Sequence, residues 1–390
     1  MYTSQTPEQF PRPPEPVHPM TLPLPPLRLT GATVLRDGAM QRRSLAIADG
    51  RITRGPLPEV DLTGYLILPG IVDLHGDAFE RQLAPRPGAM FPLDRALIAT
   101  DREAAANGVT TAWLAQGWSW EGGYRAPDAA EALLAAHAAL KPRFLTDLRV
   151  QLRAETHLVD EGPRLIAACA RWGVGYVVFN DHLPEGLAIL QRDPGALAAW
   201  ARKLGRKPED MGAAIAEAET RGRAVPRHLC RLAEAFDDLG VVYGSHDDPD
   251  GETRERYQMI GARIAEFPTT RRAAAAAAAM GAPVLLGAPN VVRGRSQAAN
   301  VAARDLIAEG LCDALVSDYH YPALAQAAFA IDDAGLLPLP RAWELISTRP
   351  AEILRLPDRG RIAHGLRAGV GGYGKAHLLG PLRPGFGRGQ

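Results

Sequence analysis

The sequence predicts an α/β protein built on a TIM (β/α)8 barrel, with a small β-sandwich-like module at its N-terminal side. After Pro69-Gly70, eight strand-like runs alternate with helical stretches, and eight such repeats over about 250 residues match the size of a TIM barrel. Several of these runs end in histidines or acids, as expected at the C-terminal rim of a barrel. A doubly wound parallel sheet is the alternative fold.

The eight runs are short, apolar and rich in β-branched residues, which favours buried parallel strands. They are Ile71–His75, Thr110–Gln116, Leu148–Glu155, Tyr176–Asp181, Val241–His246, Arg263–Phe267, Val284–Gly287 and Ala314–Asp318. Amphipathic periodicity predicts helices over Ala129–Leu140, Pro163–Trp172, Arg227–Leu239 and Gln297–Glu309. Arg271–Met280 holds seven consecutive alanines and is also expected to be helical. The segment Gln191–Thr220 exceeds one crossover helix and predicts a helical insertion over the barrel mouth.

The regions that flank the barrel differ from it in composition. Residues 1–26 hold nine prolines and are expected to form a disordered tail. Residues 27–69 predict the β-module, with the turn signal Asp49-Gly50 between two of its strands. Its expected strands are Leu27–Thr30, Ala32–Leu35, Ser44–Ala48 and Arg51–Thr53. The barrel is expected over 70–354, residues 355–370 are candidates to join the β-module, and 371–390 are expected to be irregular.

The composition narrows the class of protein. The chain has 390 residues, 46% hydrophobic and 23% charged, with a formal net charge of zero. No overall field therefore attracts nucleic acid or an acidic membrane, and an anionic ligand needs local cations. Three cysteines without CxxC spacing argue against a disulfide framework and a thiolate zinc site. Without a signal peptide pattern or an apolar run of about 18 residues, a cytoplasmic protein is expected.

The chemistry is concentrated where the predicted strands end. His75 and Asp77 lie two residues apart, so in a strand they point from the same face. Other runs end in acids or histidines, namely Glu155, Asp181-His182, His246-Asp247-Asp248 and Ser317-Asp318. Since the ends of barrel strands converge, these side chains are expected to surround common metal ions. The alternative for each residue alone is a structural role at a strand end.

The predicted ligands are imidazoles and carboxylates without a thiolate, a set that suits zinc, manganese or a similar divalent ion. They are His75, Asp77, Glu155, His182, His246 and Asp318. Two ions joined by a hydroxide are expected, with Glu155 as the bridging carboxylate. Asp318 and His246 are the predicted catalytic residues, and Asp318 would accept the proton of the attacking water. His157 is expected either to support a ligand or to face the substrate.

These motifs resemble the amidohydrolase superfamily and, more closely, its PhnM family of phosphonate metabolism. The resemblance runs from about Leu27 to Ala368 and includes a His-x-Asp at His75 and Asp77, where most amidohydrolases have His-x-His. The other matching segments are Ala84–Pro87, Leu152–Glu155, Ser245–Asp248, Ala265–Thr270, Gly287–Gly294 and Ser317–Tyr319. The family pattern is lost after Ala368, where a segment rich in Gly, Pro and Arg follows; a reading-frame change in the gene would produce such a segment.

The resemblance implies hydrolysis of α-D-ribose 1-methylphosphonate 5-triphosphate to the 5-phosphate and pyrophosphate, in the carbon–phosphorus lyase pathway. A substrate of that charge requires cations and neutral donors beside the metal ions. The candidates within or beside the matching segments are Arg86, Arg153, Asn290, Arg293, Ser296 and Asn300, with Arg295 as a further cation. The expected partners are thus a small phosphorylated substrate and, as an open possibility, further copies of the chain. Hydrolysis of a cyclic amide or N-acyl bond, and an inactive scaffold, are the alternative functions.

Overall fold

The computed structural model describes residues 25–296 and 300–374, and of residues 372–374 only the backbone. Eight parallel strands form one sheet in the order β15-β14-β13-β12-β11-β10-β9-β8. They are β8 (Ile71–Gly76), β9 (Val109–Trp118), β10 (Asp147–Glu155), β11 (Tyr176–Asn180), β12 (Val242–His246), β13 (Ile264–Glu266), β14 (Val284–Gly287) and β15 (Ala314–Val316). Each overlaps one of the eight predicted runs, and the ends of strand and run differ by at most two residues.

The sheet closes between its first and last strands. The bridge Gly76–Asp318 is parallel, and the backbone nitrogens of Asp318 and Asp77 donate to the carbonyls of His75 and Asp318 at 3.0 and 2.7 Å. Near the start of β8, away from this bridge, the backbone nitrogen of Val72 donates instead to the carbonyl of Ile346, at 2.9 Å. The result is a TIM-like barrel that closes at the rim carrying the predicted ligands, and it excludes the doubly wound sheet.

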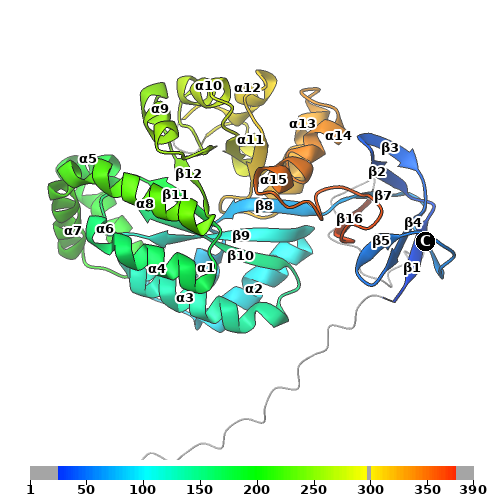
Figure 1. Cartoon of the computed structure of the whole chain (residues 1–390), viewed down its shortest axis with the longest axis horizontal. Coiled ribbons are helices and arrows are strands. Elements are labelled where there is room, and N and C mark those ends of the chain that lie inside the picture. Colours follow the sequence, from blue (N-terminus) through cyan, green and yellow to red (C-terminus); the bar gives the residue numbers. More distant parts are fainter. Residues whose placement is uncertain (1–24, 297–299, 375–390) are drawn as a thin grey trace, which may run out of the picture.

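The helices surround the barrel (Figure 1). They are α1 (Phe79–Leu83), α2 (Leu93–Ala106), α3 (Pro127–Leu140), α4 (Gly162–Trp172), α5 (Leu183–Arg192), α6 (Pro194–Lys203), α7 (Pro208–Thr220), α8 (Val225–Leu239), α9 (Gly251–Met259), α10 (Arg271–Ala279), α11 (Ala288–Arg293), α12 (Ala303–Ala308), α13 (Ala323–Asp333), α14 (Leu339–Glu344) and α15 (Thr348–Ile353). Short 3-10 helices are Gly123–Arg125, Lys141–Arg143, Val159–Glu161 and Gly222–Ala224. The alanine-rich segment forms α10, which Thr270 caps through a hydrogen bond from the nitrogen of Ala273.

Side chains of each strand alternate between two apolar cores. Val177 and Phe179 of β11 pack outward against the helices, while Tyr176 and Val178 pack inward with side chains such as Leu285. Burial on both faces explains why the strand segments are continuously apolar. The inward layer fills the barrel below the rim and supports the polar side chains above it.

The predicted helical insertion Gln191–Thr220 is present as α6 and α7, and α5 packs against both. These helices share a small core with Trp120 and Tyr124, which follow β9. Figure 1 shows them at the end of the barrel opposite the two small sheets. The predicted helix Gln297–Glu309 is shorter in the structure: residues 297–299 lie outside the described part of the chain, and α12 begins at Ala303.

The β-module contains two four-stranded sheets, ordered β5-β4-β1-β6 and β16-β7-β2-β3. Its strands are β1 (Leu27–Thr30), β2 (Thr33–Arg36), β3 (Ala39–Arg42), β4 (Leu45–Ala48), β5 (Arg51–Thr53), β6 (Glu59–Asp61), β7 (Tyr65–Pro69) and β16 (Val370–Gly374). Strands β3, β6 and β7 were not among those predicted. The expectation of an irregular segment from residue 371 is wrong for 371–374, which pair antiparallel with β7. Residues 1–24 and 375–390 lie outside the described residues, with the predictions made for them.

Candidate metal centre

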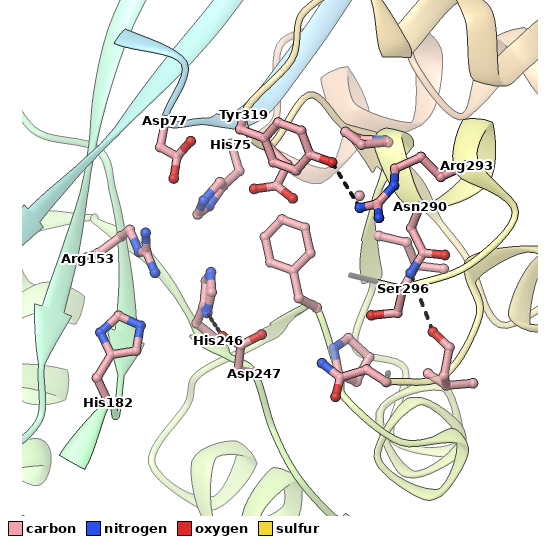
Figure 2. Close-up of a pocket in the computed structure, with 18 of the residues that line it drawn as sticks. His75, Asp77, Arg153, His182, His246, Asp247, Asn290, Arg293, Ser296 and Tyr319 are labelled. Carbon is pink, nitrogen blue, oxygen red and sulfur yellow. Dashed lines mark hydrogen bonds and ion pairs between the residues drawn. The ribbon is translucent and has the colours of Figure 1, made fainter. Parts of the chain in front are cut away.

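A cavity of about 310 Å3 opens at the C-terminal rim of the barrel and is lined by most of the predicted site residues (Figure 2). Its predicted metal ligands are His75, Asp77, His182, His246 and Asp318, and its predicted substrate-binding residues are Arg153, Asn290, Arg293, Ser296 and Asn300. Arg125, Asp247, Phe267 and Tyr319 also line it. Side chains from distant parts of the chain therefore meet in one space, as the convergence of strand ends requires.

The first ligand cluster contains His75, His246 and Glu266, whose candidate ligand atoms all lie within 4.8 Å of one another. His75 Nδ1 and Glu266 Oε2 are 2.7 Å apart. Glu266 also accepts hydrogen bonds from Gln151 and Tyr176, so its two oxygens are held from three sides. Because a carboxylate only accepts, the shared proton lies on His75 Nδ1, and Nε2 remains available to a metal ion.

Electrostatics inside the barrel match this geometry. Burial alone would lower the pKa of His75, but the negative charge and hydrogen bond of Glu266 outweigh it and raise that pKa. Burial raises the pKa of Asp318 to about 6, and the charge of Asp77 adds to this effect. Burial also raises the pKa of Asp77, followed by the charge of Glu80. The two carboxyls thus lie in a buried space in which a cation would stabilise their charged forms.

Three residues that are not glycine adopt left-handed backbone angles at this rim. Asp247, Phe267 and Asp318 have φ of 59°, 52° and 55°, each directly or shortly after a barrel strand. Each backbone nitrogen nevertheless donates to a neighbouring strand, to the carbonyls of Glu266, Leu285 and His75. Such angles cost about 1–3 kcal/mol each and persist only where the surrounding contacts hold the residue in place. All three side chains line the cavity.

A second ligand cluster contains Glu121, Glu155 and His182, again with candidate ligand atoms within 4.8 Å of one another. His182 Nδ1 lies 2.7 Å from Glu155 Oε1 and 3.0 Å from Glu121 Oε1. Both carboxylate side chains are 1% exposed. Burial would lower the pKa of His182, yet the charge of Glu155 and the hydrogen bond to Glu121 raise it to about 10. The two carboxylates therefore stabilise a positive charge that lies between them.

Two of the three arginines that line the cavity, Arg153 and Arg293, lie on opposite sides of the first cluster in Figure 2. Arg153 is buried, donates to Asn180 Oδ1 at 3.3 Å, and its Nε has no partner among the described residues. Arg293 is exposed at the end of α11, beside Asn290 and Ser296. Its Nη1 lies 3.5 Å from the hydroxyl of Tyr319.

Other predicted residues lie elsewhere. Arg86 is exposed in the loop after α1 and does not line the cavity, so its place does not support the predicted role in substrate binding. Arg295 is exposed and does not line the cavity either. His157 lies 3.4 Å from Asp181 Oδ1, also outside the cavity lining. Asp248 accepts a hydrogen bond from Ser245 at 2.6 Å and pairs with the buried Arg254.

The donor set fits divalent metal ions. Imidazole nitrogens and carboxylate oxygens suit zinc, manganese and related ions, and His246 Nδ1 faces the carboxylate of Asp247, with 2.9 Å between Nδ1 and Oδ2. Glu266 fixes one histidine by its other ring nitrogen, the arrangement that metal-binding histidines usually have.

A comparison with known proteins adds the family. The α-D-ribose 1-methylphosphonate 5-triphosphate diphosphatase of Escherichia coli (strain K12) is 32% identical over 342 residues, which cover 83% of this chain and 89% of the relative. The chain belongs to this diphosphatase family. No protein-family model matches the sequence.

Solved structures share the fold of this family member at low sequence identity. Dihydropyrimidinase from Brevibacillus agri NCHU1002 is 12% identical with a TM-score of 0.55, and 88% of this chain and 85% of that one are covered. An uncharacterized metal-dependent hydrolase from Pyrococcus furiosus is 10% identical with a TM-score of 0.58, covering 88% and 98%. The zinc complex of N-acyl-D-glutamate deacylase from Bordetella bronchiseptica is 17% identical with a TM-score of 0.54, covering 90% of each chain. None of the helices within residues 25–296 and 300–374 combines the length and the apolar character that a membrane span requires.

Sequence reasoning missed two acids of the site, Glu266 and Glu121. Glu266 lies inside the sixth predicted strand, one residue before its end, and an acid at an inward position of a buried strand was the available signal. Glu121 lies beyond the end of β9, in the loop Ser119–Gly122, where an acid is common and carries no signal of its own. Only the tertiary fold brings it beside His182.

Proposed function

We propose that this protein hydrolyses α-D-ribose 1-methylphosphonate 5-triphosphate to the corresponding 5-phosphate and pyrophosphate. The family relationship supports this activity. The observation that carries it is that metal-ligand side chains and guanidinium groups line the same cavity. A polyphosphate needs both, because the reacting phosphoryl group and the leaving pyrophosphate carry several negative charges.

Bound divalent ions would supply an activated water and would neutralise the oxygens of the reacting phosphoryl group. His75, Asp77, His246 and Asp318 are proposed to hold one ion, and Glu155 and His182 another. Zinc and manganese both suit these donors. Glu266 would keep His75 in the tautomer that offers Nε2, through the hydrogen bond of 2.7 Å.

The reaction breaks the bond between the α-phosphorus and the oxygen that joins it to the β-phosphate. A water oxygen forms the new bond to the α-phosphorus, and one proton of that water passes to the carboxylate of Asp318, which faces the cavity. The buried Arg153 is proposed to bind the α-phosphate, and the exposed Arg293 with Asn290, Ser296 and Asn300 the leaving pyrophosphate. Hydrolysis then leaves a 5-phosphate and free pyrophosphate.

Phosphorus NMR in water enriched in oxygen-18 tests this function. The metal-loaded protein should release pyrophosphate, and the heavy oxygen should appear in the 5-phosphate and be absent from the pyrophosphate. A parallel assay with cyclic amide and N-acyl substrates tests the alternative hydrolase. Turnover of those substrates without pyrophosphate release would reject the proposal, and a metal-loaded protein inactive on both classes would favour the scaffold.

A further inference from the structure

The helical insertion contacts the second ligand cluster directly. Trp200 of α6 donates its indole Nε1–H to Glu121 Oε2 at 2.9 Å. Arg206, which follows α6, donates from Nη1 to the carbonyl of Glu121 at 2.7 Å. The loop that carries Glu121 is therefore held by the insertion through both its side chain and its backbone.

In each carboxylate of this cluster both oxygens accept hydrogen bonds from neighbouring donors, and Oε1 also faces His182 Nδ1. Glu121 Oε2 accepts from Trp200 and pairs with Arg125 Nη1 at 3.1 Å. Its Oε1 lies 3.0 Å from His182 Nδ1 and also accepts from Ser119 Oγ at 3.1 Å. Ser119 and the donors on Oε2 therefore hold the Glu121 carboxylate with its Oε1 close to the imidazole.

Glu155 has the same arrangement. Its Oε2 accepts from the indole of Trp120 and from the backbone nitrogen of His182, both at 3.2 Å. Its Oε1 accepts from Asn180 Nδ2 and lies 2.7 Å from His182 Nδ1. The rings of Trp120 and Trp200 contact each other, with centroids 6.0 Å apart. One tryptophan from the barrel loop and one from the insertion thus orient the two acids.

We propose that Glu121, Glu155 and His182 bind a divalent cation of their own, and that Trp200 is a positioning residue which aims Glu121 at it. The inference rests on the proposed function only in taking the cavity to hold cations. It assigns Glu121 as a ligand and gives the inserted helices a role in completing the second site. Donors on the far oxygen of a ligating carboxylate orient it, and their loss typically weakens metal affinity 10–100-fold.

The test is the number and affinity of Zn2+ ions bound to the full chain, from elemental analysis after desalting and from calorimetric titration. The wild-type chain should bind two equivalents. Glu121→Gln, which keeps size and removes the charge, and Trp200→Phe, which removes the Nε1–H donor, should each weaken one equivalent by 10–100-fold. His75→Asn should weaken the other equivalent.

Trp172→Phe is the matched control. Trp172 is partly buried like Trp200, but it ends α4 and stacks with Arg171 outside the cavity lining. This variant should bind Zn2+ like the wild type. Circular dichroism and thermal unfolding show which variants fold; if Glu121→Gln does not, Trp200→Phe decides, because it keeps both carboxylates.

The inference would be overturned if Glu121→Gln, or a folded Trp200→Phe, bound two Zn2+ ions with wild-type affinity. It would also be overturned if the wild-type chain bound one ion whose affinity neither substitution changed. Pyrophosphate release is measured separately. Two ions without pyrophosphate release would reject the proposed function and leave this cation site standing. Pyrophosphate release by a protein that binds a single ion, at His75, would reject this cation site and leave the proposed function standing.

Discussion

Ser317 donates hydrogen bonds to both oxygens of Asp73, from its backbone nitrogen at 2.8 Å and from its hydroxyl at 2.6 Å. The two residues belong to opposite ends of the barrel sheet, where the regular ladder is reduced to a single bridge. The carboxylate therefore replaces missing ladder hydrogen bonds at the closure. His75 lies two residues after Asp73 and Asp318 one residue after Ser317, so this contact helps to fix the positions of both site residues.

Gly76→Ala tests the closure. A Cβ at Gly76 would lie 2.7 Å from Ser317 Oγ and 3.0 Å from Asp73 Oδ2, so one of the two must move. We expect the free energy of unfolding to fall by about 1–3 kcal/mol, with weaker metal binding, measured by urea denaturation and calorimetry. Gly175→Ala is the control, since a Cβ there meets nothing within 4 Å. Equal stability of the two variants would contradict the proposed tightness of the closure.

Asp318→Asn should lower kcat by about 100- to 10,000-fold while the protein stays folded, because the amide cannot accept a proton from water. Pyrophosphate release gives the rate, and circular dichroism checks the fold. Asp305→Asn, on the exposed side of α12, should retain wild-type kcat. Near-normal turnover in Asp318→Asn would remove Asp318 from the proposed proton transfer.

Glu266→Gln should weaken binding of the ion at His75 by about 10–100-fold. The amide is neutral, so it no longer stabilises the proton on His75 Nδ1 by charge, and it leaves the second cluster unchanged. Zn2+ titration measures the effect, with Glu121→Gln as the variant expected to affect the other equivalent. A full complement of tightly bound Zn2+ in Glu266→Gln would show that this carboxylate is not needed to orient His75.

Arg293→Gln should raise KM by about 10–100-fold with a smaller change in kcat, since a charge-assisted hydrogen bond contributes about 1.5–3 kcal/mol to ground-state binding. Arg86→Gln provides the matched control, because Arg86 is equally cationic and exposed but does not line the cavity. Its kinetic constants should stay at the wild-type values. A larger effect at Arg86 than at Arg293 would reverse the assignment and restore the sequence-based prediction for Arg86.

Asp147→Asn tests an ion pair between the barrel and the segment that returns to the β-module. Arg359 Nη1 and Arg149 Nη2 lie 2.6 and 2.8 Å from Asp147 Oδ2. Burial would raise the pKa of Asp147, but these two arginines outweigh it and lower the pKa to about 2. Because the pKa of Asp147 is lower in the folded protein than its ordinary value of 3.8, the ionised side chain stabilises the fold at pH values above 3.8. This stabilisation is lost as the pH falls from 3.8 toward 2.

The variant should therefore lose about 1–2 kcal/mol of unfolding free energy at pH 7. Its difference from the wild type should shrink between pH 4 and pH 2, as measured by urea denaturation across that range. Asp305→Asn should show no such pH-dependent difference. A constant difference at every pH would mean that packing, and not the charge of Asp147, accounts for the loss.

Much of the fold could be predicted because local patterns carry it. Buried parallel strands are continuously apolar, so all eight barrel strands were recognisable, and the excess length of Gln191–Thr220 revealed the inserted helices. The β-module was harder. Strands β3 and β6 are short and contain no fully buried residue, so they show little alternation to detect. Val370–Gly374 is a glycine-rich strand, which pairs through its backbone with β7 although its composition disfavours strands.

The site residues also differ in how far the local sequence predicts them. Acids and histidines directly at strand ends, such as His75 and Asp318, could be found because position in the fold follows from position in the strand. The isolated Glu121 could not, since its partners His182 and Trp200 lie 61 and 79 residues away. Arg86 was predicted to bind substrate because it lies in the matching segment Ala84–Pro87, but the loop after α1 places it outside the cavity lining.

The sequence alone determined the barrel, the position of its strands in the chain and the kind of atoms offered to a cation, because hydrophobic periodicity and residue chemistry are local properties. The tertiary structure decided how those atoms are grouped. It separates the acids and imidazoles into two clusters, one fixed by Glu266 inside the barrel and one fixed by Trp200 from the insertion. The grouping depends on which side chains donate to each carboxylate, and these donors come together only when distant segments pack.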